Sequence, residues 1–241
     1  MNTIKGKHAV MEALQSEASI ERIVISFQAQ HHPDMRSILH LAKQKRVKVQ
    51  IASKDAFERG GADKHAQGVM AYLDETEMQS LDDLLRLESL PPFIVMVDHI
   101  QDPFNFGAIL RTCETLGVSW VIYPKDRNCP ITPGVVKASS GAIHHMNLVR
   151  VTNLAQSLEK LEKAGYWIYG TSDQGATDLD SFKPHAPMVL IVGNEEKGLS
   201  PLLAKKTHGI IKISMHGKVS SLNVSVAAGI LIYTLSRSLQ G

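Results

Sequence analysis

Two apolar runs constrain the fold of this chain most strongly. Residues 93–97 and 188–192 contain no polar side chain, so neither run alternates apolar with polar positions. A strand that exposes one face to water shows such alternation, whereas a parallel strand covered by helices on both faces does not. Expected helices and strands alternate around both runs. The sequence therefore predicts an α/β domain with an open parallel sheet, in which ligands bind beyond the carboxyl ends of the strands.

Hydrophobic periodicity and turn residues predict the other elements. Helices are expected over 6–16, 34–45, 53–59, 81–87, 105–116, 133–139, 154–164 and 224–237, with a short one starting at Ser200-Pro201. Strands are expected over 21–27, 47–51, 69–73, 93–97, 120–123, 166–170, 188–192 and 210–213.

Charge divides the chain into three segments. Residues 1–72 hold 11 Lys/Arg against 7 Asp/Glu, residues 73–90 hold one against six, and residues 91–241 hold 14 against 11. We therefore expect a small α/β domain over 1–73, an acidic linker over 74–90 and a larger domain over 91–241. Each domain is mildly basic, which favours a phosphate-bearing partner. The alternative is that these charges only form a solvated surface of mixed sign.

Several classes of protein are disfavoured. The two cysteines form no CxxC and no dense Cys/His cluster, so no metal site is expected. The phosphate-binding loop of NTPases and the glycine fingerprint of dinucleotide-binding folds are both missing from the sequence. Residues 1–20 contain no signal-peptide pattern. Residues 219–236 carry no charge, but polar residues crowd their first half, so a buried helix is expected and no membrane span. The expected location is the cytoplasm.

Polar segments follow three of the expected strands. They cover 98–105, 193–198 and 214–223, and we expect them to converge at one end of the sheet. The first contains Asn105, and Arg111 follows on the same expected helix. Arginine can bind a phosphate through two parallel hydrogen bonds, which lysine cannot do. The alternatives are a helix cap for Asn105 and a surface ion pair for Arg111.

In the second segment, Gly193 and Gly198 permit close backbone approach or positive φ, and Glu195 supplies a carboxylate. A glycine-rich turn with a solvated acid is the alternative. In the third, Ser221 and Asn223 stand where a loop enters a helix.

Such a junction offers free backbone N–H groups to a ligand, although both side chains would also serve as simple caps. Ile213 and Leu222 flank this loop; they are core residues on one interpretation and walls around a purine on the other.

Together the three segments resemble the SpoU family of RNA 2′-O-ribose methyltransferases. The relevant stretches are Asn105–Arg111, Gly193–Leu199 and Ser221–Val226, and the third is the most specific. The N-terminal unit, with Gly6–Val10, resembles the substrate-binding domain of the 23S ribosomal RNA guanosine 2′-O-methyltransferases, a small α/β domain similar to ribosomal protein L30e. Relatives that act on tRNA often lack this domain.

The resemblance implies a trefoil knot in the C-terminal part, an exception to the rule against threading. It also implies a homodimer, a 23S rRNA or precursor substrate, and S-adenosylmethionine bound near Gly193, Ile213 and Leu222. Arg111 would support the reacting 2′-oxygen. Asn105, Glu195, Ser221 and Asn223 would position Arg111, the ribose and the cofactor loops.

Three alternatives stay open at this point. They are a tRNA ribose methyltransferase of the same family, an RNA-binding paralogue without activity, and an α/β protein that uses another nucleotide. The chain also departs from the family pattern at two positions. Phe104 stands where a small or polar residue is common, and Ser214 stands where proline often follows the strand.

Overall fold

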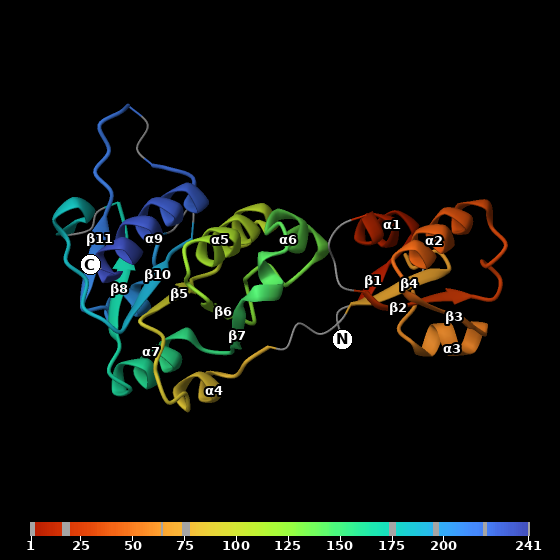
Figure 1. Ribbon diagram of the computed structural model, residues 1–241, viewed down its shortest axis with the longest axis horizontal. Helices are drawn as coiled ribbons and strands as arrows, with labels where there is room; N and C mark the ends of the chain where they lie inside the picture. Colours follow the sequence, from red (N-terminus) through yellow and green to blue (C-terminus); the bar gives the residue numbers. More distant parts are fainter. Residues whose placement is uncertain are drawn as a thin grey trace. The chain divides into compact units, whose positions relative to one another are not determined.

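The structure is a computed structural model that describes residues 3–15, 20–63, 65–73, 78–173, 177–194, 198–218 and 221–240. Two compact units divide the chain. The first comprises Met1–Thr76 and Ile131–Lys137, and the second comprises Glu77–Pro130 and Ala138–Gly241. Each unit has its own sheet (Figure 1).

The N-terminal unit is built on a four-stranded sheet with the order β1-β4-β2-β3. Its elements are β1 (Thr3–Lys5), α1 (Lys7–Gln15), β2 (Ile20–Ser26), α2 (Pro33–Gln44), β3 (Lys48–Ala52), α3 (Lys54–Arg59) and β4 (Val69–Leu73). Side chains alternate between the two faces of β2 because successive residues of a strand point in opposite directions. Ile23 and Ile25 belong to the core cluster that also holds α1 and α2 residues, whereas Val24 belongs to the cluster around Phe57 of α3.

The C-terminal unit contains a seven-stranded sheet with the order β7-β6-β5-β10-β8-β11-β9. Every strand pair assigned in this sheet is parallel. Its strands are β5 (Phe93–Val97), β6 (Trp120–Pro124), β7 (Asn147–Val151), β8 (Trp167–Thr171), β9 (Thr177–Asp178), β10 (Met188–Val192) and β11 (Gly209–Lys212). Its helices are α4 (Leu81–Leu85), α5 (Pro103–Thr115), η1 (Ala142–His145), α7 (Leu154–Lys163), η2 (Leu179–Ser181), α8 (Pro201–Ala204) and α9 (Val224–Gln240), and α6 (Pro133–Ala138) crosses the division between the units.

Helices cover both faces of this sheet, as the two apolar runs predict. Helices α5 and α9 lie on one face, and α4 and α7 lie on the other (Figure 1). All five residues of β5 and all five of β10 are buried. Leu81 and Leu84 are also buried in the core beneath α4, so this part of the expected linker packs within the C-terminal unit.

Strand β10 lies between β5 and β8, both of which precede it in the chain. It pairs in parallel with each of them along most of its length. This α/β fold, with a parallel sheet preceded by a smaller unit, is the expected one. The trefoil knot itself stays a prediction.

Helix α5 begins earlier than its sequence pattern suggests. Asp102 is the N-cap, because its carboxylate accepts hydrogen bonds from the N–H groups of Phe104, at 2.6 Å, and Asn105, at 2.9 Å. Asn105 therefore stands inside the first turn, and the interpretation of Asn105 as a cap is wrong. Strand β7 was not predicted from the sequence, because Asn147 is only partly buried and Arg150 is exposed among its buried apolar residues.

None of the helices in the described part of the chain is both long and apolar enough to cross a membrane.

Candidate functional site

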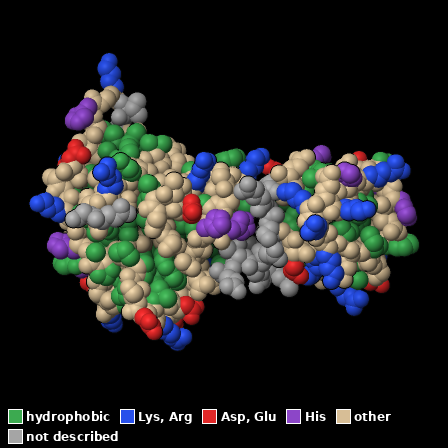
Figure 2. Space-filling view, viewed as in Figure 1, with side chains coloured by type: hydrophobic (Ala, Val, Ile, Leu, Met, Phe, Trp, Pro, Cys, Tyr) green, Lys and Arg blue, Asp and Glu red, His purple; other side chains and the backbone are tan. Residues whose placement is uncertain are grey.

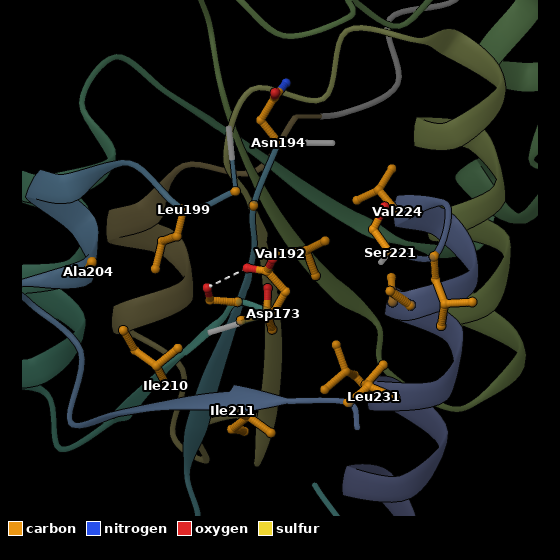
Figure 3. Close-up of a pocket in the computed structure, with 18 of the residues that line it drawn as sticks. Asp173, Val192, Asn194, Leu199, Ala204, Ile210, Ile211, Ser221, Val224 and Leu231 are labelled. Carbon is orange, nitrogen blue, oxygen red and sulfur yellow. Dashed lines mark hydrogen bonds between the residues drawn. The ribbon is translucent and has the colours of Figure 1, made fainter. Parts of the chain in front are cut away.

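A cavity of about 590 Å³ opens at the carboxyl ends of β8, β10 and β11. Strand ends supply one side of it and the first turns of α9 supply another. Leu199 and Ile210 lie on one side of the cavity, and Val224 and Leu231 of α9 lie across from them (Figure 3). This is the end of the sheet at which parallel α/β proteins bind ligands.

The loop after β10 requires glycine at two positions, for different reasons. A Cβ atom on Gly193 would lie 2.5 Å from the carbonyl carbon of Gly198 and 2.6 Å from the nitrogen of Leu199. Gly198 itself has a φ of +64°, which side chains disfavour. The backbones of Asn194 and Gly198 form two hydrogen bonds, at 2.8 and 2.9 Å, which close the loop. Glu195 lies outside the described residues.

Four of the expected site residues line the cavity. They are Gly193, Ile213, Ser221 and Leu222. Ile213 and Leu222 are only partly buried, so they form walls of the cavity and are not core residues. The loop that carries them is joined to η2 by Ser214, whose hydroxyl donates to the carboxylate of Asp178. This hydrogen bond, together with one from the N–H of Asp180, holds the pKa of Asp178 below its ordinary value. Ser214 therefore anchors the loop.

Asn223 joins the entrance of α9 to the entrance of α5. Its Nδ2 donates to Oδ1 of Asn105 at 3.0 Å, across 118 residues of chain. Its own Oδ1 accepts from the N–H of Ser225 at 2.9 Å, which satisfies one of the unpaired donors at the start of α9. Asn223 is thus both a helix cap, as one of the sequence-based alternatives expected, and a bridge to α5, while its contact with a ligand stays a prediction.

Arg111 lies on α5 and is exposed. It is six residues further along the helix than Asn105, which corresponds to a rise of about 9 Å. The two side chains leave the helix in directions about 120° apart. Its Nη1 donates to Oγ of Ser140 at 3.0 Å. Among the described residues no acid lies within ion-pair distance of Arg111, so the hydrogen bond to Ser140 is the contact of its guanidinium that the structure shows.

Two residues outside the expected site residues hold the site loops together. Asp98, at the end of β5, is 1 % exposed, and its Oδ2 accepts from the N–H of Ser200 at 2.9 Å. It also contacts His99. Asn194 donates from Nδ2 to the carbonyl of His99 at 2.9 Å. The sequence signal for Asp98 was an acid placed directly after a buried apolar strand.

The cavity, the glycine loop and the bridged helix entrances define an α/β protein that binds a ligand at the carboxyl ends of its strands. Comparison with known proteins shows its family. The model of the SpoU rRNA Methylase family matches residues 92–233, and a model described as RNA 2′-O ribose methyltransferase substrate binding matches residues 3–79.

Relatives match along almost the whole chain. A Bacillus subtilis protein that carries the name TrmH family tRNA/rRNA methyltransferase YacO is 35% identical over 240 residues, covering 96% of this chain and 94% of its own. A relative from Staphylococcus saprophyticus with the same family name is 38% identical over 237 residues, covering 97% and 94%.

Solved structures share the fold. The SpoU methyltransferase AviRb from Streptomyces viridochromogenes, in complex with the cofactor AdoMet, superposes with a TM-score of 0.65 at 24% identity, covering 99% of this chain and 91% of its own. A TrmH/SpoU tRNA modifying enzyme from A. aeolicus is 31% identical with a TM-score of 0.57, covering 66% of this chain and 81% of its own. The chain belongs to the SpoU family of RNA 2′-O-methyltransferases, whose cofactor is S-adenosylmethionine.

The two functions of Asn223 can be separated by one substitution. Serine is about as good a cap as asparagine, but its side chain is too short to reach Asn105. We expect Asn223→Ser to change the free energy of unfolding by less than about 0.5 kcal/mol, because the cap is kept. Methyl transfer should fall at least about tenfold, because the entrance of α5 is no longer tied to α9. Thermal unfolding and turnover measured on the same preparation check both parts; a parallel loss of stability and activity would contradict the separation.

Proposed function

We propose that this protein transfers the methyl group of S-adenosylmethionine to the ribose 2′-oxygen of a guanosine in 23S rRNA or its precursor. The hydrogen bond between Asn105 and Asn223 is the observation that supports this most directly. It ties the helix that carries Arg111 to the loop that lines the cavity, so the cofactor site and the proposed reaction site are joined directly.

The lining of the cavity fits such a cofactor. Its volume of about 590 Å³ falls within the usual range for ligand sites. Ile213 and Leu222 provide apolar surface suited to an adenine ring, and the loop from Gly193 to Gly198 provides backbone groups. Thr171, Ser172 and Asp173, at the end of β8, add polar groups to the lining. The hydroxyl of Ser172 donates to the carboxylate of Asp173 at 3.3 Å (Figure 3).

The bound cofactor supplies an electrophilic methyl group, and the side chains of the protein have two tasks. The first is alignment of the 2′-oxygen with the methyl carbon, which we assign to Asn105, Ser221 and Asn223, with Glu195 as a further candidate. The second is stabilisation of the charge that develops on the 2′-oxygen, which we assign to Arg111. A guanidinium stays protonated in proteins, so Arg111 acts as an electrostatic stabiliser and phosphate holder, and the proton leaves to phosphate or water.

The N-terminal unit supports the choice of ribosomal RNA. Lys and Arg side chains are spread over its visible face (Figure 2), in keeping with a phosphate-bearing partner. The A. aeolicus neighbour, named as a tRNA modifying enzyme, matches only 66% of the chain. A tRNA substrate is the second candidate, because the relatives of full length carry names that include both RNAs.

The decisive experiment maps 2′-O-methyl groups in 23S rRNA and tRNA from cells with and without the gene. We expect that a single guanosine methyl group is missing from 23S rRNA in cells without the gene. The wild-type gene should restore this methyl group, and a gene for the Arg111→Ala variant should not. Loss of a tRNA methyl would favour the second candidate. Unchanged maps of both RNAs would rule out the proposal.

We further propose that the protein is a homodimer whose contact includes α9. Val226, Ile230 and Tyr233 recur at helical spacing and are 50%, 39% and 49% exposed, which leaves an apolar stripe on one side of the helix. A second copy of the chain is the simplest partner for such a stripe, because closed two-fold contacts are the commonest form of assembly.

A charge in the centre of this stripe should separate the subunits. We expect Ile230→Asp to convert a dimer to a monomer in sedimentation velocity, because an unpaired charge would be buried in the contact. Ser238→Asp, an exposed position further along α9, is the matched control and should leave the dimer intact. A wild-type protein that sediments as a monomer at micromolar concentration would refute the dimer.

A further inference from the structure

The guanidinium of Arg111 is held by a residue outside the three segments that define the site. Ser140 accepts a hydrogen bond from Nη1 at 3.0 Å, although it is 29 residues away in the chain. It lies between α6 and η1, in a loop that neither the motifs nor the cavity include. The bond uses one of the five N–H groups of the arginine.

The loop that carries Ser140 is fixed on both sides. The N–H of Ala142 donates to the carbonyl of Ser139 at 3.0 Å, and the N–H of His144 donates to the carbonyl of Gly141 at 3.1 Å. Ser139 and Ile143 are fully buried. Because its neighbours are anchored, the hydroxyl of Ser140 has a defined place from which to hold a long and flexible arginine side chain.

The backbone of Ser140 is itself unusual. Its φ is +50°, a left-handed conformation that residues other than glycine, asparagine and aspartate rarely adopt. Such conformations persist where the surrounding structure enforces them, and they cluster at functional sites. Gly141 follows with a φ of +81°, so the turn continues without the cost that a side chain would add.

We propose that Ser140 is a positioning residue for Arg111 in methyl transfer. By holding Nη1, it sets the rotation of the guanidinium plane and leaves the edge formed by Nε–H and Nη2–H to bind the RNA phosphate next to the reacting ribose. A guanidinium that donates two parallel hydrogen bonds to one phosphate depends strongly on such a fixed orientation. The inference rests on the role of Arg111 given under the proposed function.

Two substitutions separate the effect of the Ser140 hydroxyl from the effect of its left-handed backbone conformation. Glycine and asparagine both tolerate the left-handed conformation, but only asparagine carries an oxygen that accepts a hydrogen bond. We expect Ser140→Gly to lower kcat roughly 10- to 100-fold, because a misplaced reacting group costs about this much. The Kd for S-adenosylmethionine, measured by calorimetry, should stay within about twofold of wild type, since Ser140 does not line the cavity. Ser140→Asn should recover most of the lost rate.

Full-length protein and 23S rRNA transcribed in vitro, which carries no methyl groups, serve as the assay. Ser119→Gly, at an exposed loop position, controls for the introduction of a glycine. Equal loss in Ser140→Gly and Ser140→Asn would assign the effect to the backbone and overturn the inference. Wild-type rates in Ser140→Gly would also overturn it, provided that Arg111→Ala is inactive. Full activity of Arg111→Ala would instead reject the proposed role of Arg111.

Discussion

Arg111→Lys will lower kcat for methyl transfer by at least about 100-fold, because a donor to a developing oxyanion contributes about that much or more. Lysine keeps the positive charge but cannot form the two parallel hydrogen bonds of a guanidinium. The cavity does not include Arg111, so the Kd for S-adenosylmethionine should not change. Single-turnover rates with a saturating cofactor concentration measure the effect.

Arg150→Lys is the matched control for this substitution. Arg150 is exposed on β7, at the edge of the same sheet, and takes no part in the cavity. We expect wild-type turnover from it. Near-normal turnover in Arg111→Lys would show that charge alone is sufficient and that the bidentate contact is not used.

Gly193→Ala will weaken the binding of S-adenosylmethionine by about 10- to 100-fold, the range that an overpacked position produces. The added Cβ would meet backbone atoms of Gly198 and Leu199 at 2.5 and 2.6 Å, and backbone cannot rotate away as a side chain does. The loop that lines the cavity must therefore shift. Isothermal titration with the cofactor and with its demethylated product measures the loss.

Gly209→Ala provides the comparison. A Cβ at Gly209, on β11, would lie 3.7 Å from the ring of Tyr169, which is ordinary contact. This variant should bind the cofactor as wild type does. If Gly193→Ala also bound normally, the close approach of the two glycine backbones would have no importance for the cofactor site.

Local sequence patterns were sufficient for most of the secondary structure. The strands β5 and β10 coincide with the two apolar runs, because complete burial between two layers of helices leaves no position for a polar side chain. The start of α5 was misplaced because Asp102 and Asn105 are both good caps, and only the backbone geometry shows which of them accepts from the first turn.

Contacts between distant segments were beyond such patterns. The sequence does not indicate the hydrogen bond from Arg111 to Ser140 or the one from the N–H of Ser200 to Asp98. Each pair is brought together by the packing of separate elements. The motif segments were recognisable from the resemblance to the family, and the structure brings Gly193, Ile213, Ser221 and Leu222 to one cavity. The catalytic assignments of Asn105, Arg111, Glu195, Ser221 and Asn223 remain predictions for the experiments above.

The position of β10 has a consequence for how the protein is made. A ribosome delivers β5 and β8 before β10, yet in the finished sheet β10 separates them. A nascent chain that paired β8 directly with β5 would have to break that pairing before it could mature. Until β10 is made, the strand edges of β5 and β8 that it will occupy are unpaired, and such edges expose a folding chain to wrong pairing and aggregation.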